Sequence, residues 1–333
     1  MNIFWFRRDL RLEDNVALFK AVQEKTPVIP LFIFDIDIIE SLPKDDARIT
    51  FIYNALKDID KELKKLNSSL LVKIGKPIEV WETLISEFDI DKVFFNKDYE
   101  PYAIARDLEV SKLLQSKSIT VFTFKDQVVF EESEIVKDNG LPYTVFTPYK
   151  KKWLFHFDEK LLTENPIQNN FHRFKTDFPT LESIGFKESN IKVKPYNLDF
   201  LDDYDAIRDF PFIDKTSYVS PYLRFGLISP RKLIKIALKS NATYLSELIW
   251  REFFMQILFH FPKVVTENFK SKYNNIAWRN NEAEFDKWCK GETGYPIVDA
   301  GMRQLNETGF MHNRVRMITA GFLCKHLLID WRW

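Results

Sequence analysis

Cysteine, glycine and long apolar runs are scarce in this 333-residue sequence. The two cysteines, Cys289 and Cys324, lie far apart and lack CxxC spacing, which indicates neither a disulfide framework nor a zinc site. His260, His312 and His326 are too scattered for a metal site, so no bound metal is expected. The N-terminal sequence MNIFWFRRDLRLEDN carries charges at once, which predicts neither a signal peptide nor a membrane span. A reducing cytoplasm is the expected compartment.

The scarcity of glycine excludes one common nucleotide site. Gly75 is the only glycine before Gly140, and no GxGxxG sequence occurs, so a dehydrogenase-type cofactor loop is not expected. The sequence also shows no Ser-His-Asp pattern and no paired-carboxylate spacing that would indicate hydrolysis. Aromatic residues are plentiful, at 15%, and include 8 tryptophans. A tryptophan-rich polar cavity without acid–base machinery points toward a redox cofactor.

Charge is balanced overall but uneven along the chain. Residues 1–214 carry a net charge of −8, and residues 215–333 carry one of +8. A basic C-terminal part suits a polyanionic partner such as nucleic acid, and it suits equally a contact between an acidic and a basic domain. The length and the apolar fraction of 45% are sufficient for two domains with their own cores.

Short apolar runs alternate with helical patterns in the first 125 residues, which predicts a parallel, doubly wound α/β sheet. The predicted strands are Ile3–Phe6, Val28–Phe34, Leu70–Ile74, Lys92–Phe95 and Ile119–Phe122, and the helices between them are Asn15–Gln23, Asp46–Leu66, Ile78–Phe88 and Ala103–Gln115. Arg7, Arg8 and Arg11 follow the first strand. They could line an anion site, although salt bridges are the more common role of such arginines.

Five prolines interrupt residues 140–200, which predicts a long irregular connection between domains. From about residue 200 the pattern is helical, without alternating strands. The predicted helices are Leu201–Phe210, Pro230–Leu238, Tyr244–Phe259, Glu282–Lys290, Ile297–Thr308 and Asn313–Leu328. The chain is therefore expected to form an α/β domain at 1–130, a connector at 131–200 and an all-α domain at 201–333.

Glu247, Trp250 and Arg251 share one face of a predicted helix, because they lie three and four residues apart. For an isolated helix the simpler interpretation is a Glu247–Arg251 surface pair with Trp250 as a packing residue. The run TSYVS at residues 216–220 precedes another helix. Its hydroxyls and free amides could form a phosphate cradle or act as ordinary caps.

Asn313, Arg316 and Met317 share a face of the last predicted helix, and Ala320 and Gly321 continue that face one turn on. Small residues there would allow a flat group to approach the backbone. The alternative is that Asn313 caps the helix and that Arg316 extends toward water. An Asp-Trp pair that looks buried follows, at residues 330–331.

The sequence resembles the photolyase/cryptochrome family over essentially the whole chain, in runs that keep the family's order: FWFRRDLRLEDN, TSYVSPYLRFGLISPR, ELIWREF, GYPIVDAGMRQL, TGFMHNRVRM and LLIDW. The resemblance implies an N-terminal antenna domain and a C-terminal all-α domain that binds FAD. MHNRVRM with ELIW is similar to class I members, which act on UV-damaged DNA. These are carbon–carbon lyases that split cyclobutane pyrimidine dimers by light-driven electron transfer. A blue-light photoreceptor and a non-catalytic fragment that binds nucleic acid are the alternatives.

The resemblance assigns roles to residues of this chain. The flavin would be held by Tyr204, Thr216, Ser217, Val219, Ser220, Arg251, Asn313 and Arg316. DNA would be contacted by Arg208, Glu247, Trp250, Asn313, Arg314 and Met317, with the dimer flipped out of the duplex onto Trp250 and the phosphates on the arginines at 208 and 314. The catalytic residues would be Glu247, which hydrogen-bonds the dimer, and Trp278 and Trp331, which pass electrons to the flavin. The protein would act as a monomer.

Two departures from the family pattern modify these expectations. Family members continue past LLIDWRW with a segment that forms one wall of the flavin site and supplies an aspartate partner for Arg316. The resemblance therefore implies a truncated chain that leaves Arg316 buried without its partner, binds FAD poorly and is inactive, with an active full-length parent. Tyr102 and Ala103 stand where folate-binding members often carry Asn and Glu. The antenna chromophore is thus open between methenyltetrahydrofolate, a deazaflavin, another flavin and none.

Overall fold

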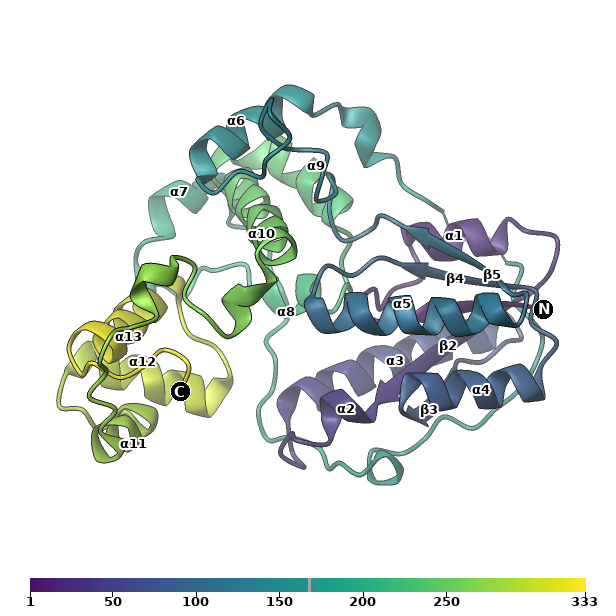
Figure 1. Ribbon diagram of the computed structural model, residues 1–333, viewed down its shortest axis with the longest axis horizontal. Helices are drawn as coiled ribbons and strands as arrows, with labels where there is room; N and C mark the ends of the chain where they lie inside the picture. Colours follow the sequence, from purple (N-terminus) through teal and green to yellow (C-terminus); the bar gives the residue numbers. More distant parts are fainter. Residues whose placement is uncertain (167–168) are drawn as a thin grey trace. The chain divides into compact units, whose positions relative to one another are not determined.

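The computed structural model describes residues 1–166 and 169–333, which divide into two compact units (Figure 1). The sheet unit comprises Met1–Ser189 and Ser220–Pro262. The helical unit comprises Asn190–Val219 and Lys263–Trp333. No helix among the described residues combines the length and the apolar character that a bilayer crossing requires.

Five parallel strands form the sheet in the order β3-β2-β1-β4-β5. They are β1 (Asn2–Phe6), β2 (Val28–Asp35), β3 (Leu71–Gly75), β4 (Lys92–Asn96) and β5 (Thr120–Phe124). Each begins and ends within two residues of a predicted strand, so the predicted doubly wound sheet is confirmed. Ile3 of β1 pairs with Ile29 of β2 on one side and with Val93 of β4 on the other. This central position explains why β1 is largely apolar.

Helices cover both faces of this sheet (Figure 1). They are α1 (Val16–Val22), the short α2 (Ile36–Ile39), α3 (Ala47–Lys65), α4 (Pro77–Glu87) and α5 (Pro101–Ser116). Phe4 and Phe6 of β1 share a core with α1 and α3, and Ile3 and Trp5 share the other core with α4 and α5. Successive side chains of a strand point to opposite faces, so β1 contributes to both cores.

The connecting segment contains a helix that the sequence analysis misses. Residues 140–200 are predicted to be irregular, but α6 (Phe146–His156) forms within them, followed by the short η1 (Glu159–Leu162) and η2 (Glu182–Ile184). No side chain caps the start of α6, so the usual local signal is absent. Tertiary packing stabilises α6 instead, because Tyr149 and Trp153 are one turn apart and both fully buried.

Three further helices belong to the sheet unit: α8 (Ser220–Arg224), α9 (Pro230–Ser240) and α10 (Ala242–His260). The last two begin and end within two residues of their predicted bounds. Trp153 of α6 donates its indole N–H to the Glu252 carboxylate of α10 at 2.7 Å, and Tyr149 packs against Phe253 with ring centroids 5.2 Å apart. α6 therefore supports the helix that carries Glu247, Trp250 and Arg251.

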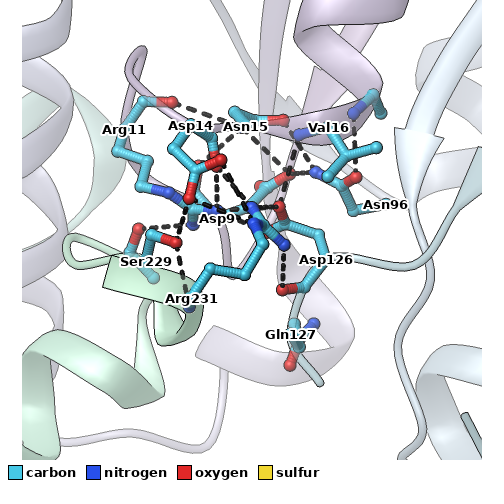
Figure 2. A network of polar contacts seen from close by, with 12 residues as sticks. Asp9, Arg11, Asp14, Asn15, Val16, Asn96, Asp126, Gln127, Ser229 and Arg231 are labelled. Carbon is cyan, nitrogen blue, oxygen red and sulfur yellow. Dashed lines mark hydrogen bonds and ion pairs between the residues drawn. The ribbon is translucent and has the colours of Figure 1, made fainter. Parts of the chain in front are cut away.

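A buried network of charges ties α9 to the sheet (Figure 2). Arg231, in the first turn of α9, contacts Asp126 at 2.8 Å and Asp14 at 3.1 Å, and Arg11 contacts Asp126 at 2.7 Å. Ser229 caps α9 and also bonds Asp14. Burial alone would raise the pKa of Asp126, but the two guanidinium groups hold it below its ordinary value. Removing one member of such a buried set costs about 3–5 kcal/mol.

The other two arginines after β1 are also in ion pairs. Arg7 pairs with Asp107, and Arg8 contacts Asp98 at 2.9 Å and Glu100 at 2.6 Å. Arg224 of α8 pairs with the same Glu100. The structure therefore shows the three arginines that follow β1 in salt bridges, rather than lining an anion site.

The helical unit contains η3 (Leu201–Asp203), α7 (Tyr204–Ile207), η4 (Pro211–Ile213), η6 (Ser271–Tyr273), α11 (Glu282–Lys290), α12 (Pro296–Thr308) and α13 (Asn313–Lys325). η5 (Pro262–Val265) begins at the last residue of the sheet unit. Strands are absent from the described residues beyond 200, as predicted. The predicted helix Leu201–Phe210 is wrong as a single element, because Pro211 forces Phe210 into an extended conformation. α13 ends at Lys325 rather than at the predicted Leu328, which has a positive φ of 54°.

α12 and α13 pack closely around Val298, Met302, Val315 and Phe322. Gly301 allows this approach, because a Cβ on it would lie 2.4 Å from the Val315 side chain. Their packing determines which face of α13 remains exposed.

Candidate functional site

Trp250 lies on α10 among aromatic rings, including Phe254, whose ring is 5.3 Å away at an interplanar angle of 22°. Phe146, the first residue of α6, stacks on Trp250 with ring centroids 3.7 Å apart and an interplanar angle of 10°. Phe253 meets it edge-on at 5.6 Å. Trp250 and Glu247 are both half-buried, one turn apart on the same helix. Trp250 therefore acts in part as a packing residue, and part of its ring remains accessible to solvent.

Arg251 is partly buried among charged groups of both signs in the sheet unit, Arg8 and Arg224 together with Glu252 and Asp126. Its guanidinium donates to the Gln127 carbonyl at 2.7 Å. Burial lowers the pKa of Arg251 to about 10, and the positive charges of Arg8 and Arg224 act in the same direction. The side chain remains charged at neutral pH. A cation in such surroundings is well suited to an anionic ligand.

Glu252 is a buried residue of α10 that the sequence analysis misses. Its carboxylate accepts hydrogen bonds from the backbone N–H groups of Val129 and Phe130 at 2.7 and 3.0 Å, as well as from Trp153. Burial raises the pKa of Glu252, and these donors oppose that shift. Glu252 thus fixes α10 to the loop after β5. A glutamate within the apolar run LIWREFFMQILF is the signal that could have identified it.

The segment predicted as a phosphate cradle is divided along the chain, with Thr216, Ser217 and Val219 assigned to the helical unit and Ser220 to the sheet unit. The Thr216 hydroxyl is buried and has no hydrogen-bond partner among the described residues. Val219 is buried, and the Ser217 carbonyl accepts from the Asn197 N–H at 2.9 Å. A buried hydroxyl without a partner is costly, so it marks a place where a polar ligand would be stabilising.

Arg208 and Arg314, the two arginines assigned to DNA phosphates, share one carboxylate of the helical unit. Arg314 donates to Asp209 through Nε at 2.8 Å and contacts it through Nη2 at 2.7 Å, and Arg208 Nε lies 3.5 Å from the same oxygen. Tyr204 lies beneath the Arg208 guanidinium, 5.4 Å from ring centroid to Cζ. The hydrogen bond from Arg314 lowers the pKa of Asp209. The sequence analysis does not identify Asp209.

The predicted common face of α13 is exposed. Asn313, Arg316, Met317 and Ala320 are all exposed, and a Cβ on Gly321 would meet no atom within 4 Å. The expectation that Arg316 is buried is wrong, because the face that packs consists of other residues, Val315, Thr319, Phe322 and Leu323.

Asn313 does not cap the N-terminus of α13, although the sequence left that role open as an alternative. His312 occupies the N-cap position, and its Nδ1 accepts from the Arg314 N–H at 3.2 Å. Burial lowers the pKa of His312, which favours the neutral ring that this bond requires. Asn313 is therefore left with its side chain exposed in the first turn.

Trp278 and Trp331 lie on neighbouring segments of the helical unit. The Arg279 N–H donates to the Leu328 carbonyl at 2.8 Å, which joins the two segments. Trp278 is half-buried with an unpartnered indole N–H among the described residues, and Trp331 donates to Asn268 at 3.0 Å. Asp330 is buried as its sequence suggested, but Trp331 is 38% exposed.

Tyr102 and Ala103 lie in the first turn of α5, in the sheet unit. The Tyr102 hydroxyl donates to Asp35 at 2.7 Å, and Ala103 is buried. Burial raises the pKa of Tyr102, and the bond to Asp35 does so further. The two positions at which folate-binding members often carry polar side chains therefore hold a tyrosine bonded within the chain and a buried alanine.

Comparison with protein families gives two matches. Residues 2–168 match the family model described as DNA photolyase, and residues 244–333 match the one described as the FAD binding domain of DNA photolyase. A deoxyribodipyrimidine photo-lyase of Synechococcus is 34% identical over 99% of this chain and 75% of that protein. One from Agrobacterium fabrum is 36% identical over 99% of this chain and 74% of that protein.

Solved structures show the same similarity. A class III photolyase from Agrobacterium tumefaciens has a TM-score of 0.82 and 34% identity, covering 99% of this chain and 74% of that one. An archaeal photolyase from Sulfolobus tokodaii, with two FAD molecules, has a TM-score of 0.87 and 33% identity, covering 100% of this chain and 77% of that one. A Synechocystis cryptochrome has a TM-score of 0.84 at 24% identity over 100% of this chain and 76% of that one, which shows a shared fold.

Proposed function

The chain belongs to the photolyase/cryptochrome family and carries its FAD-binding domain, and on that premise we propose that it is a deoxyribodipyrimidine photolyase that repairs cyclobutane pyrimidine dimers. The observation that carries the proposal is the surface of α10, where Trp250 is backed by Phe146 and followed by Arg251. One turn of α10 thus carries a carboxylate, Glu247, an aromatic platform, Trp250, and a partly buried cation, Arg251.

Two features of the chain fit FAD as the cofactor. The Thr216 hydroxyl is buried without a partner among the described residues, and Arg251 is a partly buried cation whose guanidinium donates to the Gln127 carbonyl. A hydroxyl donor and a guanidinium are suitable ligands for the phosphates of a dinucleotide. We assign Tyr204, Ser217, Val219, Ser220, Asn313 and Arg316 to the same cofactor. When bound and reduced, FAD supplies the light-driven electron that opens the cyclobutane ring.

The chain's own groups would bind and orient the lesion. Trp250 would stack on a dimer flipped out of the duplex, and stacking of a base on an aromatic ring contributes about 1–3 kcal/mol. Glu247, one turn earlier, would hydrogen-bond the dimer. Met317 and Asn313, on the exposed face of α13, would contact it as well.

We assign the remaining residues to DNA contact and electron supply. Arg208 and Arg314 would bind phosphates, because a guanidinium matches phosphate in a planar, bidentate way. Trp278 and Trp331 would pass electrons inward. The functional division we propose is an antenna part at 1–130, a connector at 131–200 and a flavin part at 201–333. The protein would act as a cytoplasmic monomer, and the antenna chromophore stays open among those named above.

A light sensor is the second candidate, because the Synechocystis cryptochrome shares the fold. A third is a non-catalytic nucleic-acid-binding protein. Binding of the FAD-supplied chain to one duplex, with and without a single dimer, together with dimer repair under blue light, separates the three. A repair enzyme binds the dimer duplex more tightly. Equal affinity with a steep salt dependence indicates non-specific binding. A photoreducible flavin without dimer repair indicates a sensor.

A further inference from the structure

Asp209 contacts both arginines assigned to DNA. We propose that Asp209 competes with the DNA phosphate for Arg208 and Arg314 and so limits how tightly the protein holds DNA. This inference rests on the proposed function, because it concerns the same phosphate contacts. It adds a residue that opposes binding, where the preceding assignments name only residues that promote it.

The geometry shows how Asp209 opposes a phosphate at these arginines. Arg314 directs Nε and Nη2 at a single oxygen of Asp209, so one of the two edges by which its guanidinium can grip a phosphate in a bidentate way is occupied. Arg208 directs Nε at the same oxygen. The Asp209 carboxylate thus partly neutralises the two guanidinium groups, and its own charge repels an incoming phosphate.

The exposure of the three side chains makes the displacement feasible. The side chains of Asp209 and Arg314 are 49% and 42% exposed, and that of Arg208 is 21% exposed. Ion pairs at such exposure contribute little stability, because water competes for both partners. A phosphate can therefore replace the carboxylate without disrupting a buried network.

The Arg208 side chain and the Arg314 backbone have contacts that do not depend on Asp209. Arg208 lies over the Tyr204 ring, and the backbone N–H of Arg314 is bonded to the His312 cap in the first turn of α13. What Asp209 adds is mainly negative charge. Its removal should strengthen DNA binding, whereas the loss of a residue that merely orients the arginines would weaken it.

The test is Asp209→Asn in the full chain with FAD, measured against one duplex with and without a dimer over a series of salt concentrations. Asn keeps the shape of Asp and removes the charge. We expect affinity for both duplexes to rise about fivefold at low salt and the slope of log K against log [salt] to steepen by about 0.9. The control is Asp203→Asn, the same charge change on an exposed residue that makes no ion pair among the described residues. It should change affinity less than twofold.

A second variant identifies the partner. In the double variant Asp209→Asn with Arg314→Gln, most of the gain in DNA affinity should disappear, because the guanidinium that Asp209→Asn frees is no longer present. Unchanged or weaker DNA binding by Asp209→Asn, or a gain equal to that of Asp203→Asn, would overturn the inference. Failure of the proposed function looks different: the unmodified chain would then show no preference for the dimer duplex, whatever Asp209→Asn does to overall affinity.

Discussion

Gly226 sits where two backbones of the sheet unit touch. Its φ is +71°, and a Cβ on it would lie 2.3 Å from the Arg8 carbonyl oxygen and 2.5 Å from Asp9 Cα. The Phe225 carbonyl beside it accepts from the Leu10 N–H at 3.0 Å. Substitution therefore adds a backbone clash to the cost of a left-handed conformation.

We predict that Gly226→Ala lowers the free energy of unfolding by about 3 kcal/mol or more. Gly140→Ala is the matched control, because Gly140 has a φ of +77° and nothing within 4 Å of a Cβ. That variant should lose only about 1 kcal/mol. Denaturant unfolding measures both, and equal losses would show that the close approach at Gly226 is unimportant.

The burial of His312 predicts that the stability of the helical unit depends on pH. Its pKa lies below the ordinary value of 6.5 because the ring is buried, so the folded state binds the proton less readily than the unfolded state. Stability is then fully present above pH 6.5 and falls as the pH drops through the lowered pKa. Protonation also removes the Nδ1 acceptor that caps α13.

The measurement is unfolding of the chain and of His312→Asn between about pH 8 and pH 5. Asn caps a helix without titrating in this range. As the pH falls, the free energy of unfolding of the unmodified chain should therefore decrease more than that of His312→Asn. Parallel pH profiles would rule out a contribution from His312.

Residue spacing could predict some of the site but not all of it. Helical spacing placed Asn313, Arg316 and Met317 on one face, which is confirmed. It could not show that Arg316 is exposed, because that depends on which face of α13 packs on α12. Asp209 was missed because its partner Arg314 is 105 residues away in the sequence. Residues brought together by tertiary structure leave no local pattern.

At the scale of elements, α6 is the helix that local signals did not reveal. It lacks a capping side chain, and its stability comes from Tyr149 and Trp153 packed on α10. Strands β1–β5 were predictable from their short apolar runs, and α9, α11 and α12 from the helical spacing of their apolar residues. α6 has a functional consequence as well, since its first residue is Phe146, which stacks on Trp250.

We predict that Phe146→Ala reduces affinity for dimer DNA about three- to tenfold, the contribution of a stacked aromatic pair, while FAD is retained. Trp250→Ala should reduce it further, by about 10- to 100-fold, again without loss of FAD. Phe155→Ala is the control, an aromatic residue of α6 that is 80% exposed. Titration with a dimer duplex measures the affinity for dimer DNA, and the flavin absorbance measures how much FAD is retained. Loss of FAD together with dimer binding in Trp250→Ala would mean that Trp250 is only a core residue.

At the scale of the whole molecule, the boundary of the compact units differs from a simple division along the sequence. Residues 220–262 belong to the sheet unit because Arg231 is buried against Asp14 and Asp126 (Figure 2). These partners are separated by more than 100 residues, so periodicity cannot predict the contact. The pairing also accounts for part of the charge asymmetry, because a basic later segment binds acidic residues of the earlier one.

The family assignment, in contrast, followed from the sequence, because several long runs occur in the family's order. The comparisons confirm the family over nearly the whole chain.

The central claim is that this chain, once supplied with FAD, uses light to reverse cyclobutane pyrimidine dimers. It replaces the expectation of an inactive chain, since Arg316 is exposed and is not a buried charge without a partner. Its most direct measurement is the fate of an oligonucleotide with one thymine dimer, incubated with the FAD-supplied, reduced protein under blue light and in darkness. The account predicts restoration of the two thymines in the light alone. Dimers that persist under illumination, while the protein still carries a photoreducible flavin, would contradict it.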